Sequence, residues 1–443
     1  MLKPAALLAT LALAACAANG QRGGPTVHAS SGAQGPSARD ARFNALSEEF
    51  VKLSLAIGER EDGYIDAYYG PPAWREAAKA DTRSLPELRA AVADLSARVR
   101  ALRPLEPLVQ RRQEFMLGQL RAADTRLRMI GGEKLSFDDE AEGLFGVRPQ
   151  LKPLSAFDPV LARIERLVPG PGPLQERVSA YQERFAIPRD RLDAVMRAAI
   201  AECRRRTVEH IPLPPQERFT LEFVTGKSWS GYNYYQGGYK SLIQINTDLP
   251  VRIERAVDLG CHEGYPGHHA YNVLLERDLA RGRGWDEFEV NPLYSPQSVI
   301  SEGSANYGIE LAFTPAERLA FTRDTLMPLA GLPAAEAERY LALLAELSAL
   351  SGARMTIGRD YLDGRITKEQ AIALTGRYEL LTRPRAEQRM AFNDQYRSYI
   401  INYGLGLDMV RAHIERGGAD KATRWARMKE LLSTPTLPSD LGR

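Results

Sequence analysis

The stretch His262-Glu263-Gly264-Tyr265-Pro266-Gly267-His268-His269 gathers three of the chain's six histidines and one glutamate into a single short segment. Histidine is the commonest metal ligand, so this segment predicts a metal site. Apolar residues at helical spacing precede it over residues 251–259 and follow it over residues 270–275. The metal site is therefore expected inside a helix or at the break between two helices.

The spacing of these histidines differs from the common zinc motif His-Glu-x-x-His, in which two histidines four residues apart bind the metal. The fourth position after His262 is Pro266, which cannot bind a metal or continue the helical hydrogen bonds. His268 and His269 follow six and seven positions after His262. Seven positions return to the same helix face, so we expect His269, rather than His268, to be the second ligand, with a kink at Pro266 that shortens the distance.

A third ligand is expected from Glu302, which begins the next helical run about thirty residues later in the sequence. A catalytic zinc ion takes three protein ligands and leaves a fourth position for water. Asn306 lies four residues after Glu302 and therefore on the same helix face. We expect its amide to hold the Glu302 carboxylate.

These motifs resemble those of a known family. Residues 262–269 match the pattern His-Glu-x-x-Pro-Gly-His-His in full, and a segment that begins with Glu302-Gly303 is similar to Glu-Gly-Trp-Ala-x-Tyr, with Ser304 at the Trp position and Tyr307 retained. The chain resembles the bacterial domain-of-unknown-function 885 family, which is related to the gluzincin-type zinc metallopeptidases. The resemblance covers most of the chain after its leader and implies a helical, metallopeptidase-like fold.

Two further segments are similar to the family. Arg354 lies where the family usually carries an Asp and a His shortly afterwards, and this chain has Gly358 and Leu362 at those places. Tyr403-Gly404-Leu405-Gly406 is similar to a Tyr-x-x-Gly pattern ahead of a closing helix. The resemblance therefore adds Arg354 and Tyr403 to the candidate catalytic residues.

The chemistry that the resemblance implies is hydrolysis of a peptide or related amide bond with one zinc ion. Glu263 would act as the general base, and Tyr403, Tyr307 or Arg354 would donate to the oxyanion. The alternative is a non-catalytic metal-containing lipoprotein that keeps the fold as a binding or assembly module. A purely structural metal site is disfavoured because none of the expected ligands is a cysteine.

Helical periodicity dominates the rest of the chain and predicts a mainly α fold, with one large helical metallopeptidase-like domain over residues 40–443. A small β-sheet or hairpin is expected next to the metal-site helix, because apolar and polar residues alternate over residues 219–224 and 242–246. The predicted helices are 43–57, 85–102, 108–129, 161–167, 174–185, 191–207, 315–329, 334–357, 368–381, 387–401 and 408–416.

Between the two predicted strands lies a segment rich in aromatic residues, amides and glycine. We interpret it as a loop that grips a polar ligand, with Tyr232, Tyr234 and Tyr235 as substrate-binding residues alongside Tyr307. Packing of these tyrosines against the helical scaffold is the alternative. The strand that directly precedes the metal-site helix would offer its edge to an extended peptide.

The chain begins like an exported lipoprotein. Met1–Ala15 has a charged start, a short apolar core and small residues at its end, which is typical of a signal peptide. Leu13-Ala14-Ala15-Cys16 resembles a lipobox, so Cys16 is expected to carry a lipid anchor in the bacterial cell envelope. Ala17 after it favours the outer membrane, with the protein facing the periplasm, and residues 16–39 form a flexible tether.

The overall charge and the remaining cysteines restrict the other partners. The formal net charge is +2, which gives no electrostatic reason to expect nucleic-acid binding. Cys203 and Cys261 remain after Cys16, and an exported chain could oxidise them, but the sequence leaves their pairing open.

Overall fold

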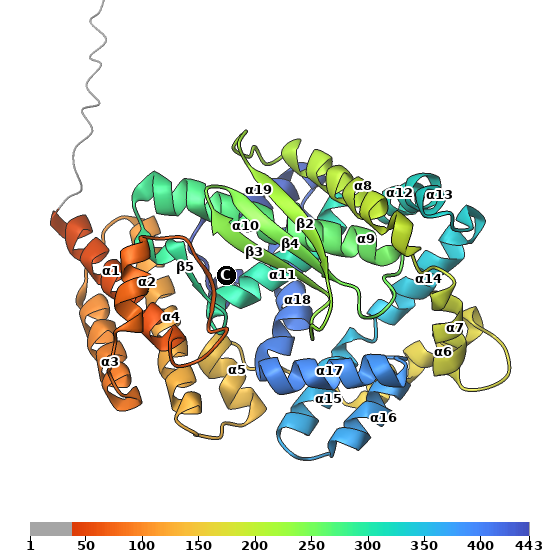
Figure 1. Cartoon of the computed structure of the whole chain (residues 1–443), viewed down its shortest axis with the longest axis horizontal. Helices are drawn as coiled ribbons and strands as arrows, with labels where there is room; N and C mark the ends of the chain where they lie inside the picture. Colours follow the sequence, from red (N-terminus) through yellow and green to blue (C-terminus); the bar gives the residue numbers. More distant parts are fainter. Residues whose placement is uncertain (1–37, 443) are drawn as a thin grey trace, which may run out of the picture.

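The computed structural model describes residues 38–442, which fold into a mainly helical molecule with two small sheets (Figure 1). The predicted mainly α fold class is therefore confirmed. The signal peptide, Cys16 and nearly all of the predicted tether lie outside the described residues, and helix α1 already begins at Ala38. Within residues 38–442, no helix has the length and apolar character needed to cross a membrane.

The first helices pack together on one side of the molecule, drawn in red to orange in Figure 1. They share a buried apolar cluster that includes Phe50, Leu88 and Leu120. Ser84 begins α3 with a capping box, in which its side chain accepts from the backbone of Glu87 while the Glu87 side chain accepts from the backbone of Ser84. The helices are α1 (Ala38–Gly58), α2 (Pro72–Lys79), α3 (Leu85–Ala101), α4 (Pro107–Ile130) and α5 (Phe137–Phe145).

A second group of helices surrounds a larger buried cluster that includes Phe185, Ile200 and Tyr340. The single helix predicted over 334–357 is two helices, because the first ends at Ser348 and the second begins at Ser351. The elements are η1 (Leu154–Phe157), α6 (Asp158–Leu167), α7 (Leu174–Glu183), α8 (Arg189–Val208), α12 (Pro315–Phe321), η5 (Thr322–Leu326), α13 (Met327–Ala330), η6 (Ala334–Glu336), α14 (Ala337–Ser348), α15 (Ser351–Leu362), α16 (Lys368–Tyr378) and α17 (Arg383–Tyr396).

The predicted small sheet lies between these two groups and contains β2 (Arg218–Val224), β3 (Gly231–Gly237) and β4 (Lys240–Asn246) in the order β2-β4-β3 (Figure 1). The prediction that the aromatic segment is a loop is therefore wrong, because this segment forms β3 and pairs antiparallel with β4. The strand directly before the metal-site helix is β4, which is central and pairs with β2 on its other side. Because β4 pairs with a strand on each side, it has no free edge to offer a peptide. The edge strands of this sheet are β2 and β3. A second sheet pairs β1 (Ile65–Tyr68) with β5 (Val290–Pro292).

The predicted break in the metal-site helix is present. Helix α9 (Glu254–Leu259) widens into the π-helical turn η2 (Gly260–Gly264), and α10 (His268–Leu275) begins three residues after Tyr265. Pro266 has no N–H to continue the ladder. A Cβ added to Gly267 would lie 1.8 Å from the His262 carbonyl oxygen, so only glycine lets the chain return this closely to the turn.

The next helix, α11 (Pro296–Ala312), carries Glu302 and crosses α18 (Ile401–Glu415) at close range. A Cβ on Gly303 would lie 2.4 Å from the Gly406 carbonyl oxygen, so the glycines of both family-like segments are needed at one helix crossing. This crossing sets the position of Glu302 next to the η2 turn. The remaining elements are η3 (Glu276–Arg281), η4 (Asp286–Glu289), η7 (Arg397–Ile400), α19 (Lys421–Ser433) and α20 (Pro438–Leu441).

Candidate metal centre

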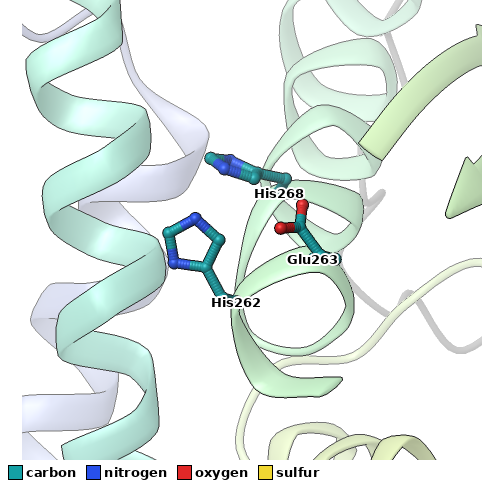
Figure 2. Close-up of side chains that lie close together, drawn as sticks. All are labelled: His262, Glu263 and His268. Atoms are coloured by element: carbon teal, nitrogen blue, oxygen red, sulfur yellow. The ribbon is translucent and has the colours of Figure 1, made fainter. Parts of the chain in front are cut away.

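Three side chains of the opening motif gather where η2 meets α10. Figure 2 shows His262 and Glu263 from the turn beside His268 from the first residue of α10. Each of the three offers a ligand atom, and these atoms all lie within 4.8 Å of one another. Two of the candidate ligands, His262 and His268, and the candidate base Glu263 therefore lie together at the helix break.

Glu302 approaches this group from α11. Its Oε2 atom lies 3.1 Å from Nε2 of His262 and 3.7 Å from Nε2 of His268. The other carboxylate oxygen, Oε1, accepts a hydrogen bond of 2.8 Å from the hydroxyl of Tyr399. The Oε2 atom is buried and has no hydrogen-bond donor. A buried carboxylate oxygen without a donor is costly unless a cation satisfies it.

Neighbouring polar groups turn both imidazoles so that Nε2 faces Glu302. Nδ1 of His262 lies 3.1 Å from Oδ1 of Asn306, whose Nδ2 donates to the carbonyl of Tyr403. Because that carbonyl can only accept, Oδ1 faces His262 and Nδ1 must carry the proton. Nδ1 of His268 lies 2.9 Å from the hydroxyl of Ser301. The expected role of Asn306 is thus corrected, since Asn306 contacts the imidazole rather than the Glu302 carboxylate.

With its proton on Nδ1, a neutral His262 would turn the lone pair of Nε2 towards the Glu302 oxygen, and a cation between these two atoms would bind both of them. Tetrahedral zinc with bonds of about 2.0–2.1 Å places neighbouring ligand atoms about 3.3 Å apart. The separations of 3.1 and 3.7 Å from Glu302 Oε2 bracket that value. His262, His268 and Glu302 therefore fit a zinc ion, and the nitrogen and oxygen donors are those of catalytic zinc sites.

The electrostatics of the site also favour a cation. Burial opposes charge on His268, but Glu302, Glu263 and Asp66 together raise the pKa of this imidazole to about 9. Burial alone would raise the pKa of Glu302, yet His268 and His262 outweigh burial and hold that pKa below its usual value. Three carboxylates thus surround two imidazoles, and this excess of acidic groups favours a bound cation.

Glu263 lies beside the three candidate ligands without a partner for its carboxylate among residues 38–442. Burial is the largest cause that raises its pKa. The strand β3 fixes the backbone here, because Nδ2 of Asn233 donates to the Glu263 carbonyl at 2.7 Å. A Cβ on Gly231 would lie 2.7 Å from Glu263 Oε1, so glycine leaves room for the carboxylate. A raised pKa and a free carboxylate suit a general base.

The structure separates His269 from the site and corrects the preference for it as the second ligand. His269 is fully buried, with Nε2 2.9 Å from the Glu217 carboxylate and Nδ1 2.7 Å from the Ser241 hydroxyl. Because Nε2 donates to the carboxylate and Nδ1 is hydrogen-bonded with the hydroxyl, neither ring nitrogen is left to bind a metal. The π-helical turn and the return at Gly267 change the helical phase, so His268, not His269, faces His262.

Two of the predicted substrate-binding tyrosines are turned away from the site. Tyr235 is buried and donates to Glu276, on the face of β3 that packs against α10. Tyr307 is buried in a different apolar cluster and donates to Glu415 at 3.1 Å. Neither hydroxyl is available to a substrate, which corrects both assignments and removes Tyr307 as an oxyanion donor.

Of the other candidates, Tyr232, Tyr403 and Arg354 have contacts that lead towards the site. Tyr232 and Tyr234 are half-buried on the opposite face of β3, and Tyr232 donates to Asp66 at 2.8 Å. The ring of Tyr403 lies parallel to the His262 imidazole, with centroids 6.4 Å apart. The guanidinium of Arg354 lies 5.1 Å from the centre of the same Tyr403 ring. Sequence reasoning therefore placed Tyr403 and Arg354 in the surroundings of the site.

Sequence reasoning missed Ser301, Tyr399 and Asp66. Tyr399 lies four residues before Tyr403, so helical spacing offered a signal for it, whereas Ser301 directly precedes Glu302 and its position next to the motif was the only signal. Asp66 comes from the short strand β1 and has no motif around it. Burial raises the pKa of Asp66 to about 6, against the hydrogen bond from Tyr232.

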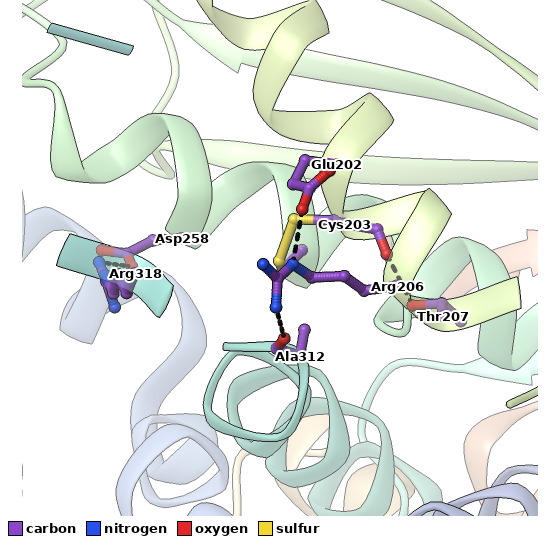
Figure 3. The surroundings of a disulfide bond; sticks show 8 residues. Glu202, Cys203, Arg206, Thr207, Asp258, Ala312 and Arg318 are labelled. Atoms are coloured by element: carbon purple, nitrogen blue, oxygen red, sulfur yellow. Dashed lines mark hydrogen bonds and ion pairs between the residues drawn. A yellow bond between two sulfur atoms is a disulfide. The ribbon is translucent and has the colours of Figure 1, made fainter. Parts of the chain in front are cut away.

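A disulfide supports the turn that carries the first ligand. Cys203 of α8 is bonded to Cys261, the residue before His262, which answers the open question of their pairing. Figure 3 shows that Arg206, one turn further along α8, also donates to the Ala312 carbonyl at the end of α11. The helix α8 is thereby tied to η2 and α11, two of the three elements that supply candidate ligands.

Removal of this disulfide should lower the stability of the whole domain. The two cysteines are 58 positions apart, and closing a loop of this size typically adds about 2–4 kcal/mol to the free energy of unfolding. The variant Cys203→Ala/Cys261→Ala should therefore unfold at lower urea concentration than the oxidised protein. Reduction should shift the wild-type midpoint towards that of the variant and leave the variant unchanged; equal midpoints before reduction would contradict the prediction.

Several chains of known structure match this one. A crystal structure described as that of "the putative lipoprotein from Colwellia psychrerythraea" matches with a TM-score of 0.50 and 15% sequence identity. The match covers 82% of this chain but 63% of that chain, so the present chain spans less than two thirds of its neighbour. Similarity at this level shows a shared fold. No protein-family model and no curated protein matches the chain.

Proposed function

We propose that the protein is a zinc-dependent hydrolase of peptide or related amide bonds, similar to the gluzincin-type metallopeptidases and to the domain-of-unknown-function 885 family. One observation carries the proposal: His262 Nε2, His268 Nε2 and Glu302 Oε2 converge, with the unpartnered carboxylate of Glu263 beside them. A structural site would need no free carboxylate next to its ligands. A hydrolase needs one as a base.

In this proposal each residue has a separate task. His262, His268 and Glu302 hold the zinc ion, which when bound activates water and polarises the substrate carbonyl. Glu263 takes a proton from the attacking water and passes it to the leaving nitrogen. Tyr403 donates a hydrogen bond from its hydroxyl to the developing oxyanion. Burial, followed by Glu302, raises the pKa of Tyr403 well above its ordinary value, which keeps this donor protonated.

The activity test is digestion of a broad library of short peptides by purified full-length protein. We expect cleavage by the zinc-loaded protein, loss of cleavage after treatment with a chelator, and recovery on addition of one equivalent of zinc. Cleavage should depend on zinc because the base Glu263 acts on a water molecule that the zinc ion activates. A protein that binds zinc but cleaves no peptide in the library would contradict the proposal and favour the non-catalytic binding or assembly lipoprotein.

We also propose that the protein is attached to the bacterial cell envelope through a lipid on Cys16, in the outer membrane and facing the periplasm. Support comes from the Leu13-Ala14-Ala15-Cys16 sequence and from the "putative lipoprotein" that shares the fold. The disulfide Cys203–Cys261 is also consistent with an exported protein, because such bonds persist in oxidising compartments.

Cys16→Ser should release the protein from membranes, because the lipid would be the only anchor we propose. The measurement is the distribution of the full chain between the membrane and soluble fractions after cell lysis, compared with the wild type. Cys203→Ala/Cys261→Ala is the matched control, since it removes cysteines without touching the anchor. If Cys16→Ser fractionates as the wild type does, the lipid anchor is wrong.

A further inference from the structure

Arg354, on α15, carries a charge that the rest of the structure does not neutralise. Its side chain is half-buried, and its guanidinium carbon lies 5.2 Å from the ring centre of Phe392 and 5.1 Å from that of Tyr403. Its Nε atom is buried without a hydrogen-bond partner. Among residues 38–442, no carboxylate forms an ion pair with Arg354.

The carboxylates that act on Arg354 are already engaged. Glu379 pairs with Arg389 at 3.2 Å, and Glu302 accepts from Tyr399 and faces the two imidazoles. Burial, followed by repulsion from Arg389, lowers the pKa of Arg354 to about 9. Burying a cation without a counter-charge is unfavourable. An anion that binds next to the Arg354 guanidinium would therefore be stabilised more strongly than an anion bound to an arginine at the surface.

The distance from Arg354 to the candidate metal centre is short. One tyrosine links the two, since the Tyr403 ring lies 6.4 Å from the His262 ring and 5.1 Å from the guanidinium carbon. These two separations limit the distance between the guanidinium and the His262 ring to about 12 Å, or roughly three extended residues. A substrate group bound at Arg354 therefore lies no more than a few residues from the bond that is cut.

We propose that Arg354 binds the free C-terminal carboxylate of the peptide substrate, so that the enzyme cuts one to three residues from the C-terminus. The inference rests on the proposed hydrolase function and adds the substrate class to it. A guanidinium holds a carboxylate through two parallel hydrogen bonds, which fixes orientation as well as charge. Arg354 thus acts as a specificity-determining residue and not as the oxyanion donor that the sequence suggested.

The test compares N-acetylated peptides of identical sequence as free acids and as C-terminal amides. We expect the wild type to prefer the free acid by about 10- to 100-fold in kcat/KM, mainly through KM, because a hydrogen-bonded charge pair is lost in the amide. Arg354→Gln should bring the ratio of acid to amide close to one, and Arg354→Lys should keep part of it. Arg359→Gln is the matched control, since Arg359 lies on the same helix and pairs with Asp360.

A binding measurement separates this role from a merely structural one. An N-acetyl tripeptide acid and its amide are titrated by calorimetry into Glu263→Gln protein, which avoids turnover, and into the Glu263→Gln/Arg354→Gln double variant. We expect the preference for the acid only when Arg354 is present, with equal melting temperatures for the two proteins.

The outcomes distinguish this inference from the proposed function. Equal cleavage of acids and amides by the wild type would overturn the inference and leave the hydrolase intact. Efficient cleavage of an amide whose last residue is Glu would also overturn it, because a side-chain carboxylate would then be the ligand. Failure of the wild type to cleave any peptide would overturn the proposed function and this inference with it.

Discussion

Glu263→Gln is expected to lower kcat/KM for peptide hydrolysis by about 100- to 10,000-fold, the usual contribution of a general base. The exchange removes the capacity to accept a proton and keeps the size of the side chain. Because Glu263 is not among the three groups that fit the zinc ion, zinc content and melting temperature should stay at wild-type values. The measurement is steady-state cleavage of a peptide from the library, at matched zinc occupancy.

The control for this experiment is Glu222→Gln, since Glu222 is an exposed glutamate on β2 that contacts Gln244. It should leave activity unchanged. If Glu263→Gln hydrolyses peptides as fast as the wild type does, Glu263 has no part in the mechanism. If its zinc content also falls, the carboxylate belongs to the ligand set instead.

His268→Ala is expected to weaken zinc binding by more than about 100-fold, because loss of a group that only supports a ligand already costs about 10- to 100-fold. Ser301→Ala and Asn306→Ala should fall in that smaller range, since each removes the partner of one imidazole Nδ1. The measurement is competition for zinc with a fluorescent chelator, with folding checked by circular dichroism.

Two other histidines provide the contrast. His210→Ala should bind zinc normally, because this imidazole stacks on Trp425. If the His269→Gln variant folds, it should also keep its zinc, since both ring nitrogens of His269 are engaged with Glu217 and Ser241. If folded His269→Gln lost its zinc while His268→Ala bound zinc normally, the second ligand would be His269, as helical spacing alone predicts.

The choice between His268 and His269 shows where local periodicity is insufficient. Seven positions return to one face only on a regular helix. Pro266 and Gly267 predicted a break in the helix. Which residues of α10 face His262 after the break depends on contacts from distant parts of the chain. A Cβ on Gly308 of α11 would lie 2.8 Å from Pro266, so the packing of α11 helps to fix the path of this turn.

The segment that forms β3 shows a second limit. Its glycines, tyrosines and amides are common in loops, and no alternation of apolar residues marks it as a strand. Pairing with β4 decides its structure, because strand formation depends on neighbours more than on the composition of the segment. Helical elements such as α3, α4 and α8 were predictable because their apolar spacing is a local property of the sequence.

The residues of the candidate site differ in the same way. His262 and Glu302 were predictable because each stands in a dense motif. Asp66 was not, because it comes nearly two hundred residues earlier, on a short strand, and reaches the site through the pairing of β1 with β5 and its contacts with β3. Only the tertiary structure brings this third carboxylate near the two imidazoles.

The most direct test of the account is anomalous diffraction at the zinc absorption edge from crystals of the full chain grown with zinc. We predict one strong peak, about 2.0–2.2 Å from His262 Nε2, His268 Nε2 and a Glu302 oxygen. A peak bound instead by His269, or full zinc occupancy with Glu302 beyond bonding distance, would contradict the ligand set on which the proposed hydrolysis depends.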